Sequence, residues 1–230
     1  DVGIYLWDSR NNTITNNTFV NDGFFVEDSY QNTVQDNTVN GKPLVYLEDA
    51  SDYRVVDAGQ VILRNCNNIT VENLDLSNTS GGIALWKTEN SKISNNTVCN
   101  NNRGGICLYY SSNNNTITGN NLSSNEEGIR LRDSNNNKIY FNNFIHNTYS
   151  VKSQSSTNIW NSPLEITYTY DGTTYESYLG NYWDDYEGTD ADGDGIGDTH
   201  YSIDPDSDES DDYPLMKPFE NYIISTSAPA

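Results

Sequence analysis

The sequence contains 230 residues with 33 acidic and 12 basic side chains, which give a formal net charge of -21 and a pI near 4.1. So large a surplus of acids excludes proteins that bind nucleic acid or anionic membranes through clustered Lys and Arg, and it favours cations as partners. No apolar run approaches the roughly 18 residues of a membrane span, so no membrane-spanning segment is expected.

Residues 1–157 are predicted to form one long series of β-helix repeats. The pattern "GIYLWDSRNNTITNNTF" returns along this region with a glycine at its start, at Gly3, Gly23, Gly82, Gly105 and Gly128, and weaker copies begin near Gly41 and Gly59. Short segments of alternating apolar and polar residues indicate strands, and the intervening Asn residues tolerate the left-handed backbone of turns. A unit of about 20 residues cannot bury its own apolar face. We therefore expect an all-β fold in which seven coils stack as a single-stranded, right-handed parallel β-helix, a solenoid.

The Asn residues of the repeats are expected to have an architectural role. Most of them precede position 148, and they recur at matching places, as Asn17, Asn96 and Asn143 do. Stacked amides can bond from coil to coil and so satisfy each other where water is excluded.

Strand alternation predicts which side chains leave the core. If the residues one and three after each repeat glycine point inward, those two and four after it project to solvent. The second-position column is Tyr5, Phe25, Ala84, Cys107 and Arg130, and the fourth-position column is Trp7, Glu27, Trp86, Tyr109 and Arg132. Exposed rings on a flat sheet suit the C–H faces of sugars. The predicted glycan-binding residues are Tyr5, Trp7, Trp86, Tyr109 and Arg132, with Asp8, Asp28 and Asp133 as acceptors for hydroxyl groups. The alternative is that the rings pack under a loop or an adjoining domain.

The three cysteines, Cys66, Cys99 and Cys107, have no CxxC spacing, and an odd number cannot form a closed set of disulfides. We expect buried, small apolar side chains. With two His and one Met, the soft ligands are too few for a copper or zinc site.

Residues 158–220 are predicted to cap the open end of the β-helix. This segment is rich in Tyr and Trp, and an open end must be covered to protect unpaired backbone groups. Tyr182, Trp183 and Tyr186 are the candidate packing residues. Positions 221–230, which end in "ISTSAPA", are expected to be a linker to a further domain of a longer, processed protein.

The stretch "DADGDGIGD" predicts a calcium loop within this cap. It supplies the side chains of Asp190, Asp192, Asp194 and Asp198 and the backbone carbonyl of Ile196, with Gly195 for the sharp turn. So many carboxylates repel one another unless a divalent cation neutralises them. Position 12 of the loop is Tyr201, not Glu, so the remaining ligand is expected from Asp184, Asp185, Asp212 or water. The second acidic run, Asp204 to Asp212, lacks this spacing and is expected to be a solvated loop or a weaker cation site.

Three motifs resemble those of NosD-like proteins. They are "GNYWDDY" at 180–186, "DADGDGIGD" at 190–198 and "DDYPLM" at 211–216, and they follow Asn-rich repeats. Proteins of this family are right-handed β-helices of the carbohydrate-binding and sugar-hydrolase repeat type, abundant among secreted and cell-surface proteins of archaea. The resemblance covers nearly the whole chain and implies this fold and an extracellular or cell-surface location. It does not imply one function, because such proteins include copper-reductase maturation factors, polysaccharide-acting enzymes and plain surface modules.

These observations favour a non-catalytic surface module that is stabilised by calcium and binds polysaccharides, glycoprotein glycans or neighbouring envelope proteins. One alternative is a polysaccharide lyase or glycoside hydrolase, with Arg130, Arg132 and Asp133 as catalytic candidates. Asp28 is expected tens of ångströms from Asp133, whereas paired-carboxylate glycoside chemistry needs roughly 5 to 9.5 Å. The other alternative is a purely structural component of a surface layer or sheath.

Overall fold

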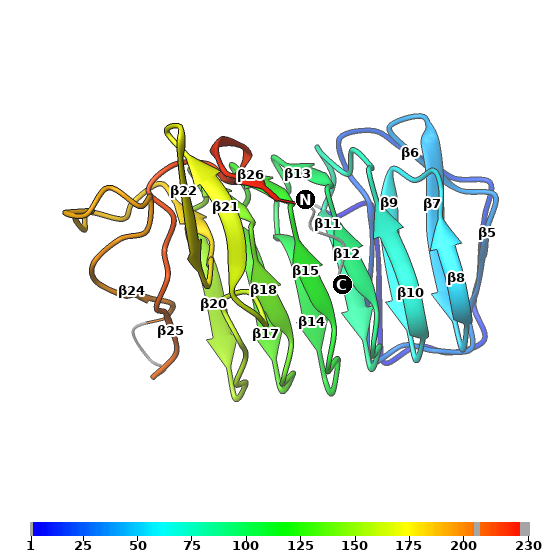
Figure 1. Ribbon diagram of the computed structural model, residues 1–230. Coiled ribbons are helices and arrows are strands. Elements are labelled where there is room, and N and C mark those ends of the chain that lie inside the picture. The colour runs from blue at the N-terminus through cyan, green and yellow to red at the C-terminus, as the bar shows by residue number, and fades with distance from the viewer. Residues whose placement is uncertain (1, 205–207, 226–230) are drawn as a thin grey trace.

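Strands of successive coils lie side by side along most of the molecule (Figure 1). The computed structural model describes residues 2–204 and 208–225. In its largest sheet, six strands pair in parallel in chain order. They are β7 (Lys42–Glu48), β9 (Gln60–Arg64), β11 (Gly81–Trp86), β14 (Gly104–Tyr109), β17 (Glu127–Arg132) and β20 (Tyr149–Gln154). The predicted parallel β-helix is confirmed, and these strands form its main row.

Two further sheets form the other sides of the coils. One consists of β8 (Ser51–Val55), β10 (Asn67–Glu72), β12 (Lys92–Ser94), β15 (Thr116–Thr118) and β18 (Lys138–Tyr140). The other consists of β13 (Thr97–Cys99), β16 (Asn121–Ser123), β19 (Asn143–Ile145) and β23 (Tyr182–Trp183). A complete coil therefore contributes one strand to each of three sheets.

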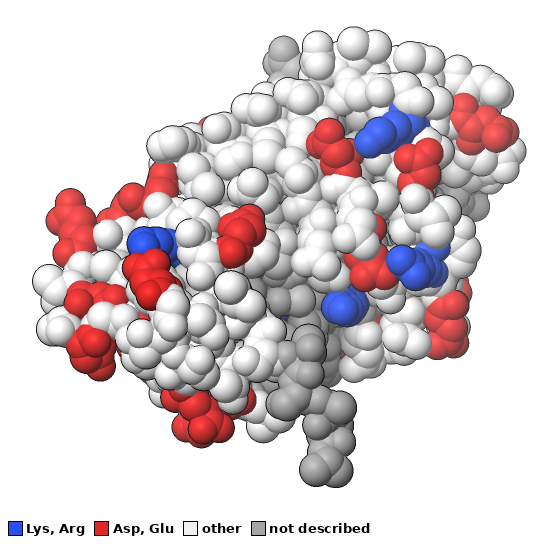
Figure 2. Space-filling model, turned by 45° about the horizontal axis from the view of Figure 1, so that its top comes forward, with Lys and Arg blue, Asp and Glu red and all other residues white. Residues whose placement is uncertain are grey.

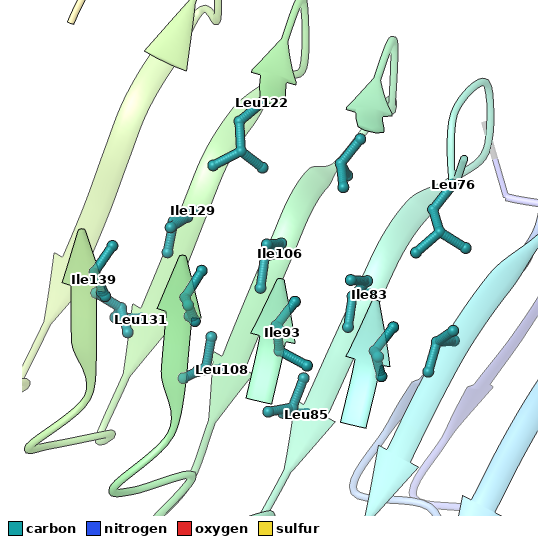
Figure 3. Close-up of a cluster of buried hydrophobic side chains, with 14 of the residues drawn as sticks. Leu76, Ile83, Leu85, Ile93, Ile106, Leu108, Leu122, Ile129, Leu131 and Ile139 are labelled. Atoms are coloured by element: carbon teal, nitrogen blue, oxygen red, sulfur yellow. The ribbon is translucent and has the colours of Figure 1, made fainter. Parts of the chain in front are cut away.

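The core lies inside these three sheets, where the alternation predicts it. Figure 3 shows one row of β-branched side chains and one row of leucines crossing the coils, Ile83, Ile106 and Ile129 beside Leu85, Leu108 and Leu131. Each of these side chains is at most 1% exposed. Burying an Ile or Leu side chain contributes about 1.5–3 kcal/mol, so each of these coils adds the burial of two such side chains to the stability of the row.

Ladders of Asn side chains hold the corners of the coils together. In one ladder the Nδ2 of Asn96 donates to Asn120 at 3.0 Å, and Asn120 in turn donates to Asn142 at 3.0 Å. In this ladder Asn142 occupies the repeat position that the sequence pattern assigned to Asn143. Turn residues before the ladder take the left-handed backbone, as Asn95 does with φ of 55°. The predicted architectural role of the Asn residues is confirmed.

The first two coils do not extend the main row, although they carry the same repeat. Their strands pair only with each other in parallel, apart from β6 beside β7. They are β1 (Ile4–Trp7) with β4 (Phe24–Glu27), β2 (Thr13–Thr15) with β5 (Thr33–Gln35), and β3 (Thr18–Phe19) with β6 (Thr38–Val39). The chain then reverses at Asn40 and Gly41, which have φ of 51° and 81°, so that β6 runs antiparallel to β7.

Residues 2–40 thus form a separate two-coil unit beside the main row. In Figure 1 the N-terminus lies near the middle of the row and not beyond its end. The expectation that all seven coils stack in one line is wrong for these two. The physical reason is that the outer face of β9, β11 and β14 is apolar. Ile62, Trp86, Cys107 and Tyr109 belong to the same buried cluster as Phe24 and Phe25 of the unit.

The C-terminal segment lies against the other end of the row. Its strands are β21 (Ile166–Tyr170), β22 (Thr173–Ser177), β24 (Tyr201–Ser202), β25 (Ser210–Asp211) and β26 (Ile223–Ile224), and a short 3-10 helix spans Phe219–Asn221. Trp183 stacks on Phe144 of the preceding coil, with ring centroids 4.2 Å apart, and Tyr201 stacks on Trp183.

The cap continues past position 220, where a linker was expected. Tyr222 is buried, and β26 pairs with β21. Residues 226–230 of that expected linker lie outside the described part. No helix in residues 2–204 and 208–225 has the length and hydropathy needed to cross a membrane.

Candidate functional site

The structure exposes some of the predicted glycan-binding residues and buries others. Tyr5 and Trp7 are exposed, at 44% and 70%, as expected. Trp86 and Tyr109 are 2% and 8% exposed, so their predicted exposure is wrong. The two rings stack on each other with centroids 4.3 Å apart, and Phe25 of the two-coil unit packs edge-on against Trp86. The alternative interpretation, that these rings pack under another part of the chain, describes them correctly.

A groove remains open next to this buried patch, along β14, β17 and β20, and at the edge strand β20 it is also lined by Leu131 and Val151 of the core. It consists of three adjoining pockets of about 640, 330 and 110 Å³, and Arg130 lines all three. Four basic side chains line the groove, Arg103, Arg130, Arg132 and Lys152. We call it the basic groove.

Each cation of the basic groove has a defined contact. Arg130 Nη1 donates to both carboxylate oxygens of Glu127, at 2.9 and 3.1 Å, and Lys152 Nζ lies 3.2 Å from the same group. Glu127 is only 4% exposed, so these two cations compensate a buried charge. Arg132 lies over the ring of Tyr110, and Arg103 lies over that of Phe25.

The sequence identified only part of this groove. Arg130 and Arg132 stand in the predicted outward columns. Lys152 is the register partner of Arg130 on the next strand. It was missed because β20 lacks the repeat glycine that marks the other coils. Arg103 was missed because it precedes the glycines of β14 and meets the groove only through the two-coil unit.

Asp28 of the two-coil unit and Asp133 of the main row both act on Tyr110. Burial raises the pKa of the Tyr110 hydroxyl, Arg132 lowers it, and the Asp28 and Asp133 carboxylates raise it further. Glu27 of the two-coil unit lines the same pocket as Arg130 and Arg132. The two-coil unit therefore brings acids of the first two coils to the side of the main row that carries the catalytic candidates Arg130, Arg132 and Asp133.

The acidic loop brings three of its predicted calcium ligands together. Asp190, Asp192 and Asp194 each place one carboxylate oxygen within 4.8 Å of the others. Asp190 accepts the N–H groups of Gly193, Asp194 and Gly195, which hold the loop in a tight turn. Burial raises the pKa of Asp194, and the neighbouring carboxylates add to this effect.

Tyrosines of the cap hold the backbone of this loop from outside. The hydroxyls of Tyr175, Tyr168 and Tyr222 donate to the carbonyls of three successive residues, 193, 194 and 195. The loop is therefore a rigid part of the cap and not a free tail.

The other two predicted calcium ligands are the backbone carbonyl of Ile196 and the side chain of Asp198. Ile196 forms an antiparallel bridge with Leu215. On either side of it, the N–H of Gly197 donates to the carbonyl of Pro214, and the N–H of Met216 donates to the carbonyl of Gly195. The N–H of Ile196 itself points to Asp194, and its carbonyl is expected on that same side, because the N–H and C=O of an extended residue share one direction. Asp198 is not in the three-acid cluster, and it accepts the N–H of Ala191 instead.

The acids expected to complete the calcium shell have partners elsewhere. Asp184 accepts the backbone N–H of His146, Asp185 accepts the hydroxyl of Tyr201, and Asp212 accepts that of Ser210. None of them belongs to the cluster that the described residues form.

The second acidic run has a structural role that the sequence did not predict. Asp211 is fully buried and accepts the N–H groups of Asn181, Trp183 and Tyr213. Burial raises its pKa to about 7, although these donors lower it. Glu209 accepts the backbone N–H of Asn158. Positions 205–207 lie outside the described residues. At Glu209 and Asp211 the expectation of a solvated loop is wrong, because the end of a β-helix leaves N–H groups that need acceptors, whereas Asp208 and Asp212 are exposed.

Stacked coils, Asn ladders and a capped end define a parallel β-helix repeat protein. The chain belongs to the NosD family, described as "Periplasmic copper-binding protein (NosD)", whose model matches residues 1–58 and 55–188. No curated protein matches the chain.

Among solved structures, crystal structures of the periplasmic alginate epimerase AlgG are similar to this chain. A double mutant of AlgG is 23% identical with a TM-score of 0.39, and the match covers 65% of this chain and 34% of that one. A third AlgG structure is 22% identical with a TM-score of 0.38, over 64% and 34% of the two chains. The match thus spans about a third of AlgG.

The residues present do not fit a copper site of the kind that the family description implies. Cys66 and Cys107 are buried far from solvent, and burial raises the pKa of the Cys107 thiol to about 12, which disfavours the thiolate that binds metal. His146 pairs with Asp184 at the surface. Among the described residues, only the three-acid cluster gathers metal-binding side chains, and carboxylates suit hard cations.

Proposed function

We propose that this chain is a non-catalytic β-helix module of the cell envelope that binds a glycan in the basic groove. The single observation that carries the proposal is the groove itself, in which three pockets that share Arg130 lie along three consecutive strands. Tyr149 lines it and is 47% exposed. Lys152 Nζ lies over one face of this ring, 3.7 Å from its centroid. Exposed aromatic surface binds the C–H surfaces of sugars, and neighbouring cations donate hydrogen bonds to sugar oxygen atoms. Trp86 and Tyr109 have no part in this proposal, because they are buried.

Affinity electrophoresis against a panel of polysaccharides tests the proposal. Tyr149→Ala is expected to weaken retention by roughly five-fold, about 1 kcal/mol for a lost ring contact. Tyr53→Ala is the matched control, since Tyr53 is 51% exposed on β8, in another sheet. Equal loss in both variants, or no retention by any polysaccharide, contradicts the proposal. Calcium-dependent self-assembly without glycan binding would favour a structural surface component instead.

We also propose that calcium binds the acidic loop and stabilises the cap. Three convergent carboxylates support this, since hard oxygen ligands attract Ca²⁺ and repel one another without it. The tyrosine hydroxyls fix the loop backbone, which lowers the cost of ordering it. Asp190, Asp192 and Asp194 would hold the ion with the carbonyl of Ile196, and water or Asp198 would complete the shell.

Thermal unfolding with excess EDTA and then with added calcium tests this second proposal. A site that exists only in the folded state raises the midpoint as the free ion increases. Asp194→Asn keeps an acceptor for the N–H of Ile196 but removes a charge, so it is expected to abolish the rise. Asp57→Asn, in an exposed turn, is expected to preserve it. A midpoint independent of calcium contradicts the proposal.

One observation favours a lyase or hydrolase as the second candidate. The fold-back of the two-coil unit places Glu27 in the same pocket as Arg132, which lies 3.9 Å from Asp133. Turnover of an envelope polysaccharide that Arg132→Ala or Asp133→Ala abolishes would establish catalysis. Binding without any product would leave the non-catalytic proposal in place.

A further inference from the structure

The basic groove contrasts sharply in charge with the rest of the molecule. The chain has 12 basic residues and a net charge of -21, and Arg103, Arg130, Arg132 and Lys152 of this small set line one groove. Acidic side chains gather over the capped end, at the left of Figure 2. A polyanion is repelled from most of this surface, so its approach is restricted to the groove.

Four acids line the groove, Glu27, Glu126, Glu127 and Asp204; Glu126 is exposed, and the other three are engaged with the protein itself. Glu127 is buried between Arg130 and Lys152. Glu27 accepts the hydroxyl of Tyr5, and Asp204 accepts the backbone N–H of Ser153. These contacts reduce the capacity of these three carboxylates to compete with a ligand.

The cations retain donor groups for a ligand. Arg103 lies over an aromatic ring and forms no ion pair within residues 2–204 and 208–225. Arg132 has only a long contact of 3.9 Å with Asp133, and its side chain is 37% exposed. Guanidinium groups present parallel N–H donors that match a carboxylate. Two guanidinium groups are therefore accessible to an anionic group.

Two of the cations are in register on neighbouring strands. Arg130 on β17 is the register partner of Lys152 on β20, whereas Arg132 on β17 is paired with Tyr109 and Gln154. Neighbouring strands are about 4.8 Å apart, roughly the length of one pyranose unit along an extended chain. A saccharide chain that crosses β17 and β20 therefore meets a cation on each of these two strands.

We infer that the glycan of the basic groove is an acidic polysaccharide whose sugar units carry carboxylates, and that Arg103 and Arg132 bind these carboxylates. This inference rests on the proposed function and adds the chemical class of the ligand. Tyr149 would contact a sugar ring, while Arg130 and Lys152 hold Glu127.

Binding of polygalacturonate and of its methyl-esterified form, compared by calorimetry, tests the inference. The backbones are the same, and esterification removes the charge. We expect polygalacturonate to bind at least ten-fold more tightly, with an affinity that falls as NaCl is added. Arg132→Gln and Arg103→Gln are each expected to weaken binding roughly ten-fold, the equivalent of one charge-assisted hydrogen bond. Lys138→Gln on β18, in another sheet, is the control for charge alone and is expected to bind as the wild type does.

The outcomes distinguish recognition of an acidic glycan from glycan binding in general. Equal binding of the esterified polymer would overturn the acidic class but leave glycan binding standing. Failure of both forms and of neutral dextran would overturn the proposed function as well. Dextran sulfate binding as tightly as polygalacturonate, or an equal loss in Lys138→Gln, would show that general charge and not carboxylate recognition is responsible. Far-UV circular dichroism of each variant checks that a loss of binding is not a loss of folding.

Discussion

The cap and the two-coil unit are attached to the same row of coils in different ways. The cap continues the row: Asn181 extends the ladder of Asn142, and Trp183 stacks on Phe144 as a further coil would. The two-coil unit lies against the outer face and contacts it mainly through side chains. The side chain of Gln60 accepts a hydrogen bond from the backbone N–H of Phe24 and donates one to the C=O of Phe24.

This difference predicts different coupling to the stability of the row. A cap that shares ladders and core should unfold together with the coils, as neighbouring repeats do. The interface of the unit is less complete, because Trp86 Nε1, Thr79 Oγ1 and Ser80 Oγ are buried without a partner among the described residues. Each such atom costs stability, so the unit is expected to detach before the row unfolds.

The largest effect is expected from Asp211→Ala in the cap. The change leaves buried N–H donors of Asn181, Trp183 and Tyr213 without an acceptor, and we expect a loss of about 3–5 kcal/mol in the free energy of unfolding. Urea unfolding monitored by Trp fluorescence measures it. Asp212→Ala, at an exposed neighbour, should change stability little, and similar losses in both variants would contradict the structural role of Asp211.

A pH dependence should follow from the same residue. The carboxyl of Asp211 has a pKa of about 7 in the folded protein against 3.8 as its ordinary value, so the folded state binds the proton more tightly. Its stabilising contribution is complete below about pH 4 and is lost as the pH rises to about 7, by about 1.4 kcal/mol per unit of pKa at most. The difference in stability between wild type and Asp211→Asn should therefore change across this interval. A constant difference would show that its hydrogen bonds keep Asp211 ionised throughout.

A smaller and more local effect is expected at the interface of the two-coil unit. Phe25→Ala removes the ring that packs on Trp86, at a cost of about 2 kcal/mol. Hydrogen exchange should show faster exchange in residues 2–40 and unchanged protection in β14 and β17. Phe144→Ala, inside the row, should instead increase exchange in the coils and the cap together. Uniform exchange in both variants would mean that the unit and the row form one cooperative structure.

The smallest effect is expected for Gln60→Ala, which removes the two hydrogen bonds to Phe24. We expect about 1–2 kcal/mol, again confined to the attachment of the unit. Gln154→Ala, at an exposed position of β20, is the control. If both variants are equally stable, the side-chain contacts of Gln60 do not hold the unit.

The sequence could not predict how the outward columns are distributed between solvent and interface. Trp86 and Trp7 occupy equivalent positions of the repeat, yet one is buried and the other exposed. The repeat specifies inward and outward faces, but not whether another part of the chain covers an outward face. The acidic run is a similar case, because Asp211 and Asp212 are adjacent acids and only their positions relative to the end of the β-helix distinguish them.

The sequence by itself determined the coil. Its glycine spacing, its alternating strands and its Asn residues each act over a few residues and between adjacent repeats, so the parallel β-helix, its core and its ladders follow from local pattern. The sequence also located the cap and the acidic loop. Only the tertiary structure decided that the chain reverses at Asn40 and Gly41, that the first two coils cover Trp86 and Tyr109, and that Arg103 joins Arg130, Arg132 and Lys152 in one groove. These features depend on contacts between residues far apart in the chain, and the burial of an apolar outer face, which has no signature in a single repeat, selects them.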